Sequence, residues 1–178
     1  TESGIPDFRG SSGLYTNTDG AVSAEEILHV NYFMKHPESF YEFYKANMIY
    51  PSARPNAAHY ALARLEAEGK LSGVITQNID GLHQMAGSQN VIELHGTAER
   101  NICMHCGKVF PKQYVISHSG VPKCDECGHM LRPDIVLYGE GLDSDSFYAA
   151  QELIYYADVL IVAGTSLRVA PASTLVQD

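Results

Sequence analysis

The four cysteines of this chain form two identical Cys-x-x-Cys pairs, Cys103 with Cys106 and Cys124 with Cys127. Two intervening residues let both thiolates of a pair reach one ion, and two such pairs supply the four sulfur ligands of a closed tetrahedral zinc site. Two disulfides or a redox pair are the competing interpretation. A closed site has no open position for water, so one Zn²⁺ is predicted to be structural, and any chemistry must lie elsewhere.

The bulk composition limits the class of protein. The chain has 178 residues, 45% of them hydrophobic, which suits one ordinary domain or a domain with a small inserted module. The formal net charge of −9 argues against nucleic acid or an anionic membrane as the main partner. No apolar run approaches the roughly 20 residues that span a bilayer. Zinc-binding thiolates and the absence of a visible leader predict a cytoplasmic protein.

Helical and apolar segments alternate after residue 20. Helices are expected after Ser23, from Pro37 and after Asn56. A further helix is expected at 147–157, and short apolar strands are expected at 71–76, 91–94, 135–138 and 158–164. The last strand is apolar on both faces, as in a buried parallel sheet. The alternation predicts an α/β fold whose ligand crevice lies beyond the carboxyl ends of the strands.

Polar residues follow the first two of these strands. Gln77, Asn78 and Asp80 offer directional donors and acceptors that suit ribose hydroxyls or an amide, and an Asx-type turn is the alternative. His95 follows the second strand. Its imidazole can serve as a general base near neutral pH, although a histidine at a strand end is often structural.

Two further segments carry polar groups of the same kind. Gly164, Thr165 and Ser166 follow the most apolar strand, where small hydroxyl residues and backbone N–H groups can hold a phosphate or simply form a turn. The Gly- and Ser-rich opening loop carries Phe8, which can cover a ring, and Arg9, which can bind a phosphate.

Together these strings give the chain a resemblance to the sirtuin family, and they occur in the family's order over nearly its whole length. They are SGIPDFRG at 3–10, TQNIDGLH at 76–83, ELHG at 93–96, the two Cys-x-x-Cys pairs, RPDIVLYGE at 132–140 and GTSLRVAPA at 164–172. The YGE variant is similar to bacterial members. The family pattern also has a strand and a GAGxS loop before the first string and strands after the last, so the resemblance implies a chain truncated at both ends.

The resemblance implies an NAD-dependent protein lysine deacetylase, which transfers the acetyl group from lysine to ADP-ribose and releases nicotinamide. It implies a Rossmann-type parallel sheet with helices on both faces at 1–100 and 132–178, and a zinc-binding module at 101–131. Part of the helical segment 20–55 belongs to the smaller domain. The partners implied are acetyl-lysine proteins or peptides, with no nucleic acid or membrane, and the oligomeric state stays open. The alternatives are a protein ADP-ribosyltransferase and a non-catalytic acetyl-lysine binding fragment.

The resemblance also assigns roles to individual residues. His95 matches the catalytic base, and Asn78 matches the residue that orients the ribose and a catalytic water. The positions that match cofactor contacts are Phe8, Arg9, Gln77, Asn78, Ile79, Asp80, Gly164, Thr165 and Ser166. The positions that match the substrate-binding segment are Val136, whose carbonyl accepts the acetyl-lysine N–H, followed by Tyr138, Gly139 and Glu140.

Overall fold

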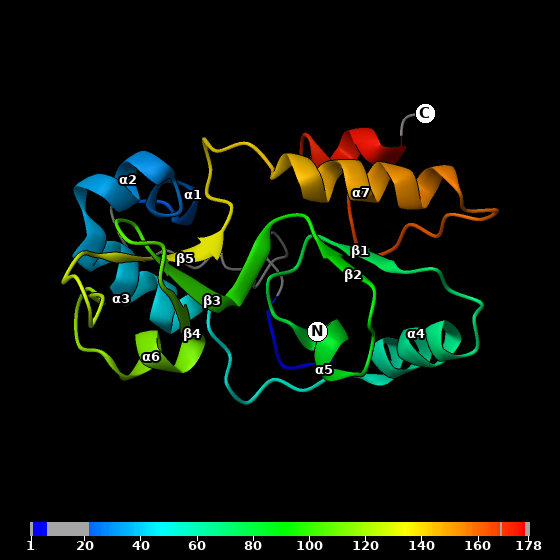
Figure 1. The fold of residues 1–178 in the computed structure, drawn as a ribbon, viewed down its shortest axis with the longest axis horizontal. Coiled ribbons are helices and arrows are strands. Elements are labelled where there is room, and N and C mark those ends of the chain that lie inside the picture. The colour runs from blue at the N-terminus through cyan, green and yellow to red at the C-terminus, as the bar shows by residue number, and fades with distance from the viewer. Residues whose placement is uncertain (1, 7–21, 168, 177–178) are drawn as a thin grey trace. The chain divides into compact units, whose positions relative to one another are not determined.

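The structure is a computed structural model that describes residues 2–6, 22–167 and 169–176. The predicted cofactor contacts Phe8 and Arg9 lie outside the described residues. The chain divides into two compact units, shown with their elements in Figure 1. The first unit is Thr1–Arg54 with Thr97–Glu140, and the second is Pro55–Gly96 with Gly141–Asp178. The predicted zinc-binding range, 101–131, falls within the first unit.

The first unit packs short helices against a three-stranded sheet of order β4-β3-β5. Ser23 caps the first helix as predicted, because its Oγ accepts the Glu26 N–H at 3.2 Å, and Pro37 opens α3. Strand β3 is antiparallel to β4, with Asn101 opposite Phe110. The elements are α1 (Ala24–Ile27), α2 (Val30–Lys35), α3 (Pro37–Asn47), β3 (Gly96–Cys103), β4 (Val109–Pro111), α6 (Lys112–Ser117) and β5 (Leu131–Ile135).

Aromatic side chains form the core of this unit. Phe33, Phe40, Tyr41 and Tyr44 are all 0% exposed, and their rings meet edge-on, except that Phe40 and Tyr44 stack at 5.7 Å between centroids. The Tyr41 hydroxyl donates to the Leu131 carbonyl at 2.7 Å. This bond ties α3 to the first residue of β5, the strand that leads into the predicted substrate-binding segment.

The second unit is a two-stranded parallel sheet between helices. Strands β1 and β2 pair with Thr76 opposite Glu93, and Figure 1 shows α7 on one side of this pair and α4 with α5 on the other. Asn56 caps α4 as predicted, with its Oδ1 accepting the Ala58 and His59 N–H groups. The elements are α4 (Ala57–Ala67), β1 (Val74–Thr76), α5 (Leu82–Met85), β2 (Val91–Glu93), α7 (Ser144–Tyr155) and η1 (Ala172–Val176). The α/β class is confirmed.

Two predicted strands differ from the structure. The strand expected at 135–138 lies earlier, at Leu131–Ile135, where it pairs within the sheet of the first unit. The strand expected at 158–164 does not form, and Val159 and Ile161 are 76% and 80% exposed. A strand needs a neighbour to take its backbone hydrogen bonds, and within the described residues β1 pairs only with β2. The apolar sequence of residues 158–164 is therefore not sufficient to make this segment a strand.

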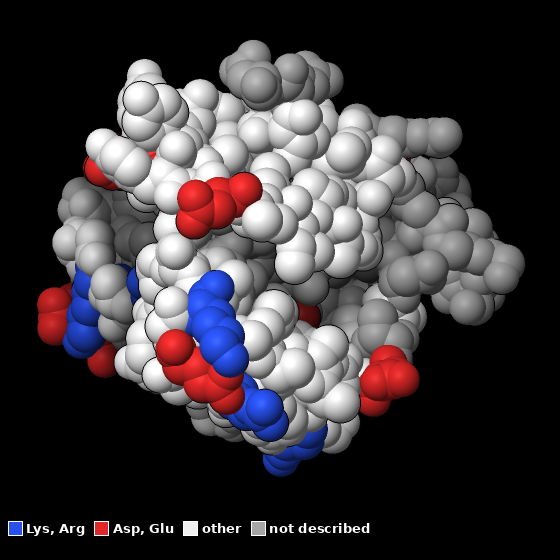
Figure 2. Space-filling view, turned by 90° about the vertical axis from the view of Figure 1, so that its right-hand side faces the viewer, with Lys and Arg blue, Asp and Glu red and all other residues white. Residues whose placement is uncertain are grey.

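Charge is unevenly distributed over the surface. Figure 2 shows one face with few charged side chains in its upper half and a mixed group of basic and acidic side chains below. In the second unit, Glu68 pairs with both Arg64 and Lys70, at 3.0 and 2.8 Å. Glu68 is therefore paired with a basic side chain on each side of it. None of the helices in the described residues is both long and apolar enough to cross a bilayer.

Candidate active site and metal centre

The carboxyl ends of β1 and β2 bring two of the predicted polar segments together. Pairing continues one residue past β2, because the Leu94 N–H donates to the carbonyl of Thr76, the last residue of β1, at 2.9 Å. Gln77 and His95 therefore leave the sheet as neighbours. The His95 Nδ1 lies 2.9 Å from the Gln77 carbonyl oxygen. The predicted base and the predicted ribose-contacting segment thus meet at one edge of the second unit.

The contact with Gln77 decides which nitrogen of His95 can act as a base. A carbonyl oxygen only accepts, so Nδ1 must carry the proton and the lone pair of the neutral ring lies on Nε2. Burial lowers the pKa of His95, and the hydrogen bond to Gln77 offsets part of that decrease. The ring is therefore neutral at pH 7 and presents Nε2 as a proton acceptor.

The third predicted segment reaches the same edge through Gln77. Its side-chain Nε2 donates to the Thr165 Oγ1 at 3.4 Å, a long hydrogen bond. Thr165 Oγ1 also accepts the Leu167 N–H at 3.1 Å, which fixes the turn that contains Gly164 and Ser166. The structure thus brings segments 77–80 and 95 together at the ends of β1 and β2, and the Gln77–Thr165 contact adds segment 164–166 although no strand precedes it.

The residues between Gln77 and α5 form a tight turn. The Asn78 N–H donates to the Thr76 Oγ1 at 3.1 Å, while its side chain is exposed. The Asp80 Oδ1 accepts the Leu82 N–H at 2.9 Å, at the start of α5. The Asx-type turn considered as an alternative is therefore present, but it orients the Asp80 carboxylate rather than excluding a ligand role. Ile79 lies half-buried between them.

The predicted substrate-binding segment, 136–140, belongs to the first unit. Tyr138 is held on both sides of its main chain, because its N–H donates to Leu28 and its carbonyl accepts from Val30, each at 3.0 Å. Gly139 has φ +88°, and a Cβ there would lie 2.7 Å from the His29 ring. Only glycine fits this position. The segment is thus fixed against residues 28–30.

Arg132 opens the RPDIVLYGE string but has no role predicted from the sequence, and in the structure its side chain contacts Glu140. The guanidinium donates to both carboxylate oxygens, Nη1 to Oε1 and Nη2 to Oε2, each at 2.9 Å. Burial raises the pKa of Glu140, but hydrogen bonds from Arg132 and the Leu137 N–H outweigh it and the net shift of the pKa is downward. Glu140 is therefore a carboxylate at neutral pH.

The four cysteines converge in the first unit as the spacing predicts. Their Sγ atoms all lie within 4.8 Å of one another, and the nearest pairs are 3.4–3.6 Å apart. A Zn–S bond of about 2.3 Å puts tetrahedral sulfurs about 3.8 Å apart, whereas a disulfide needs about 2.0 Å. The arrangement fits a structural zinc ion.

The two halves of the cysteine cluster have the same backbone geometry. Gly107 donates its N–H to the Cys103 carbonyl and Gly128 donates to the Cys124 carbonyl, both at 3.0 Å. The two glycines have φ of +73° and +71°, a region that side chains disfavour. Each Cys-x-x-Cys-Gly string therefore folds into the same turn, which directs both of its thiols to one point.

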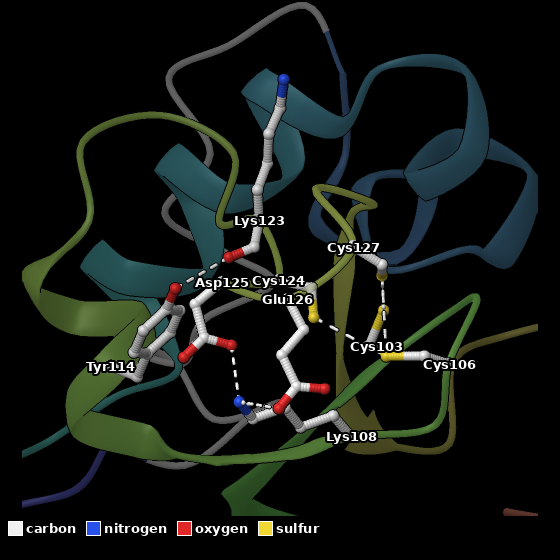
Figure 3. A network of polar contacts seen from close by, with 9 residues as sticks. All are labelled: Cys103, Cys106, Lys108, Tyr114, Lys123, Cys124, Asp125, Glu126 and Cys127. Atoms are coloured by element: carbon white, nitrogen blue, oxygen red, sulfur yellow. Dashed lines mark hydrogen bonds and ion pairs between the residues drawn. The ribbon is translucent and has the colours of Figure 1, made fainter.

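An ion-pair network joins the two turns (Figure 3). Lys108, directly after the first turn, lies 2.7 Å from both Asp125 and Glu126, the residues between the second pair of cysteines. Hydrogen bonds to these two carboxylates raise the pKa of Lys108. The Tyr114 hydroxyl also donates to the Lys123 carbonyl at 2.9 Å. Side chains thus hold the metal-binding turns against each other.

These features define a class: an α/β protein with a four-cysteine centre and a histidine base at the carboxyl edge of its parallel strands. The Sir2 family model matches residues 1–171, and the chain belongs to this family. It is 53% identical to the NAD-dependent protein deacetylase of Clostridium acetobutylicum, covering 99% of this chain and 73% of that one. The Thermotoga maritima protein of the same name is 46% identical, covering 98% and 71%.

Solved structures give the same result. A histidine-to-alanine variant of Sir2 with a deacetylated p53 peptide and 3'-O-acetyl-ADP-ribose matches with a TM-score of 0.89 at 43% identity, over 99% of this chain and 71% of that one. A Sir2 complex with a p53 peptide and NAD⁺ matches with a TM-score of 0.84 at 43% identity, over 99% and 70%. The predicted family is therefore confirmed.

Proposed function

We propose that this protein is an NAD-dependent protein lysine deacetylase, a transferase that moves the acetyl group of lysine to ADP-ribose and releases nicotinamide. The observation that carries the proposal is the neutral His95, whose Nδ1 proton is engaged by Gln77 and whose Nε2 is left as the base. The names of the relatives and the ligands of the matching Sir2 structures support the same activity.

NAD, when bound, supplies the ribose hydroxyl that accepts the acetyl group and the nicotinamide that leaves. His95 accepts a proton from that hydroxyl on Nε2. The Gln77 carbonyl holds the Nδ1 proton in the direction needed and stabilises the imidazolium as it forms. Because burial lowers the pKa of His95, the base is regenerated readily after each transfer.

The residues around His95 are proposed to hold NAD. The Asn78 amide orients the ribose and a water, and Asp80, fixed by the Leu82 N–H, binds the carboxamide of nicotinamide with the Ile79 backbone. The remaining proposed contacts, on the ribose and phosphates or over the reacting carbon, are Gln77, Gly164, Thr165, Ser166, Phe8 and Arg9. The hydrogen bond between Gln77 and Thr165 supports a shared ribose and phosphate role for their two segments.

The substrate is proposed to be an acetyl-lysine protein or peptide. The Val136 carbonyl accepts the side-chain N–H of acetyl-lysine, and the backbone at Tyr138 and Gly139 lies beside the peptide. Main-chain recognition of this kind reads few side chains, so a broad set of sequences should be accepted. One structural zinc ion on the four cysteines stabilises the unit that carries this segment. A cytoplasmic location is supported by thiols that stay reduced there.

Protein ADP-ribosylation is the second candidate function, and retention of a base at His95 favours acetyl transfer over it. A peptide labelled in its acetyl group, incubated with full-length protein and NAD, should yield labelled O-acetyl-ADP-ribose. NAD labelled in its adenine should leave no label on protein. Adenine label on the protein, without labelled O-acetyl-ADP-ribose, would instead indicate ADP-ribosyl transfer. If neither the acetyl label nor the adenine label is transferred, the protein only binds its ligand.

The matched pair His95→Ala and His118→Ala gives the site-specific control. His118 also places its Nδ1 near a backbone carbonyl, that of Tyr114 at 2.7 Å, but in the first unit. His95→Ala should lower acetyl transfer by about 10²–10⁴-fold, the usual contribution of a general base. His118→Ala should leave it within about twofold. Equal losses in both variants would remove the assignment of His95 as the base.

A further inference from the structure

We infer that Arg132 and Glu140 act as a pair that positions the backbone of residues 135–139 for the peptide, so that Glu140 works through Arg132 and not by touching the substrate. This inference rests on the proposed function, in which Val136 and Gly139 meet the peptide. It makes both members of the pair positioning residues for the reaction.

The pair closes a loop of the first unit with a set of directed bonds. Arg132 donates to both oxygens of Glu140 at 2.9 Å, a bidentate geometry that fixes orientation as well as distance. The same Nη2 donates to the Ile135 carbonyl at 3.1 Å. Glu140 Oε2 also accepts the Leu137 N–H at 2.9 Å. One ion pair therefore holds backbone groups at two positions inside the loop that it closes.

Burial makes this arrangement more than a surface ion pair. The Arg132 and Glu140 side chains are 29% and 22% exposed, so solvent screens their attraction less than for an open pair. Both carboxylate oxygens and at least two guanidinium nitrogens are already in use. Glu140 therefore has its acceptors turned toward its own loop, which leaves little capacity for a peptide.

The bonds of this loop leave a specific part of the backbone for a ligand. Leu137 and Glu140 bond to each other through main chain and side chain, and Tyr138 is paired with residues 28 and 30. In the described part of the chain, the backbone groups of Val136 and Gly139 have no hydrogen-bond partner. The two open residues thus flank the fixed residues Leu137 and Tyr138, and the pair sets where those open groups point.

The strand β5 supplies a matched control. Asp134 is two residues from Arg132 and forms its own ion pair with Arg100, with Nη2 to Oδ2 at 2.8 Å. That pair joins β5 to β3 and contacts no backbone group of residues 135–139. Asp134→Asn removes the same charge from the same part of the unit as Glu140→Gln, without releasing the loop.

The test is steady-state kinetics on full-length protein with an acetyl-lysine peptide, comparing Glu140→Gln, Arg132→Gln, the double variant and Asp134→Asn. Loss of one charge-assisted bond should raise the peptide KM by about tenfold or more. In these variants the KM for NAD should stay within about twofold of the wild-type value. In Asp134→Asn, the KM for the peptide and the KM for NAD should both stay within about twofold of wild type. The double variant should lose no more than either single variant, because both remove one interaction.

The outcomes separate positioning from direct contact. An Arg132→Gln variant with unchanged peptide KM, beside a Glu140→Gln variant with a raised one, would overturn the inference in favour of direct contact. Equal increases in the KM for NAD and the KM for the peptide would show that the pair only stabilises the fold. An effect of Asp134→Asn on the peptide KM as large as that of Glu140→Gln would show the same. If wild-type protein shows no NAD-dependent deacetylation, the proposed function fails instead, which is a distinct result.

Amide hydrogen exchange tests the same inference without catalysis. In Glu140→Gln, the hydrogen-bonded amides of Leu137, Tyr138 and Glu140 should exchange about tenfold faster than in wild type, while those of β5 keep their protection. Asp134→Asn should leave residues 136–140 unchanged. Unaltered exchange at 136–140 in a folded Glu140→Gln variant would show that the pair does not hold the loop.

Discussion

The stability of the protein should respond differently to removal of the hydroxyl from each of two tyrosines one turn apart on α3. Both side chains are 0% exposed and lie in the same aromatic core. The Tyr41 hydroxyl donates to the Leu131 carbonyl at 2.7 Å, whereas the Tyr44 hydroxyl has no hydrogen-bond partner among the described residues. Tyr41→Phe and Tyr44→Phe therefore delete the same atom from two different environments.

The magnitudes follow from those environments. Tyr41→Phe loses one short buried hydrogen bond and should lower the free energy of unfolding by about 1–2 kcal/mol. Tyr44→Phe removes a hydroxyl whose burial without a partner costs about 1–3 kcal/mol, so it should be neutral or stabilising by about 1 kcal/mol. Burial raises the pKa of both phenols, so both are protonated at neutral pH and neither substitution changes the charge.

Urea unfolding of full-length protein, followed by circular dichroism, measures the difference. The midpoint should fall for Tyr41→Phe and hold or rise for Tyr44→Phe, with unchanged m-values because the exposed surface is the same. The ring contacts survive in both variants, so packing cannot account for a difference between them. A Tyr44→Phe variant as destabilised as Tyr41→Phe would contradict this expectation, because it would require a hydrogen-bond partner for the Tyr44 hydroxyl.

Four other predictions concern His95, the metal centre and Gly139. Burial lowers the pKa of His95 below 6.5, so more than half of the His95 side chains are neutral at pH 6.5. The acidic limb of the kcat–pH profile should therefore have its midpoint below pH 6.5. A midpoint above pH 6.5 would show that burial does not lower this pKa. By linkage, the same shift makes the unfolded state bind more protons, so stability should fall as pH drops below 6.5. Removing zinc with a chelator should unfold the first unit, because structural zinc contributes on the order of 10 kcal/mol, and an unchanged melting temperature would argue against a metal on the four cysteines. Gly139→Ala places a Cβ against His29 and should destabilise by about 1–3 kcal/mol; a Tm equal to that of wild type would show that the loop relaxes freely.

The sequence predicts the metal centre and the helix starts well because their signals are local. The cysteine spacing and the glycine after each pair specify the turn without reference to the rest of the fold. Ser23, Pro37 and Asn56 act within one helical turn of their own position. The convergence of residues 77–80 and 95 also follows, because the parallel strands β1 and β2 end at a common edge. Residues 164–166 join them through the Gln77–Thr165 hydrogen bond and not through a strand of their own.

The sequence predicts the strands less well, because their positions depend on pairing with segments that are distant in the chain. The segment 158–164 has a strong strand pattern, but a strand depends on a neighbour, and no local signal supplies one. The shift of β5 to Leu131–Ile135 has the same origin, since register is set by the adjoining strand. The contact between Arg132 and Glu140 is also invisible in the motif that contains both, because it depends on how the loop folds back.

The most direct test of the central assignment is nicotinamide release by full-length protein, measured with and without an acetyl-lysine peptide. Release should depend on the peptide and yield free lysine in equal amount, and His95→Ala should lose the lysine product while His118→Ala keeps it. Nicotinamide released at the same rate without peptide, or free lysine formed normally by His95→Ala, would contradict this assignment.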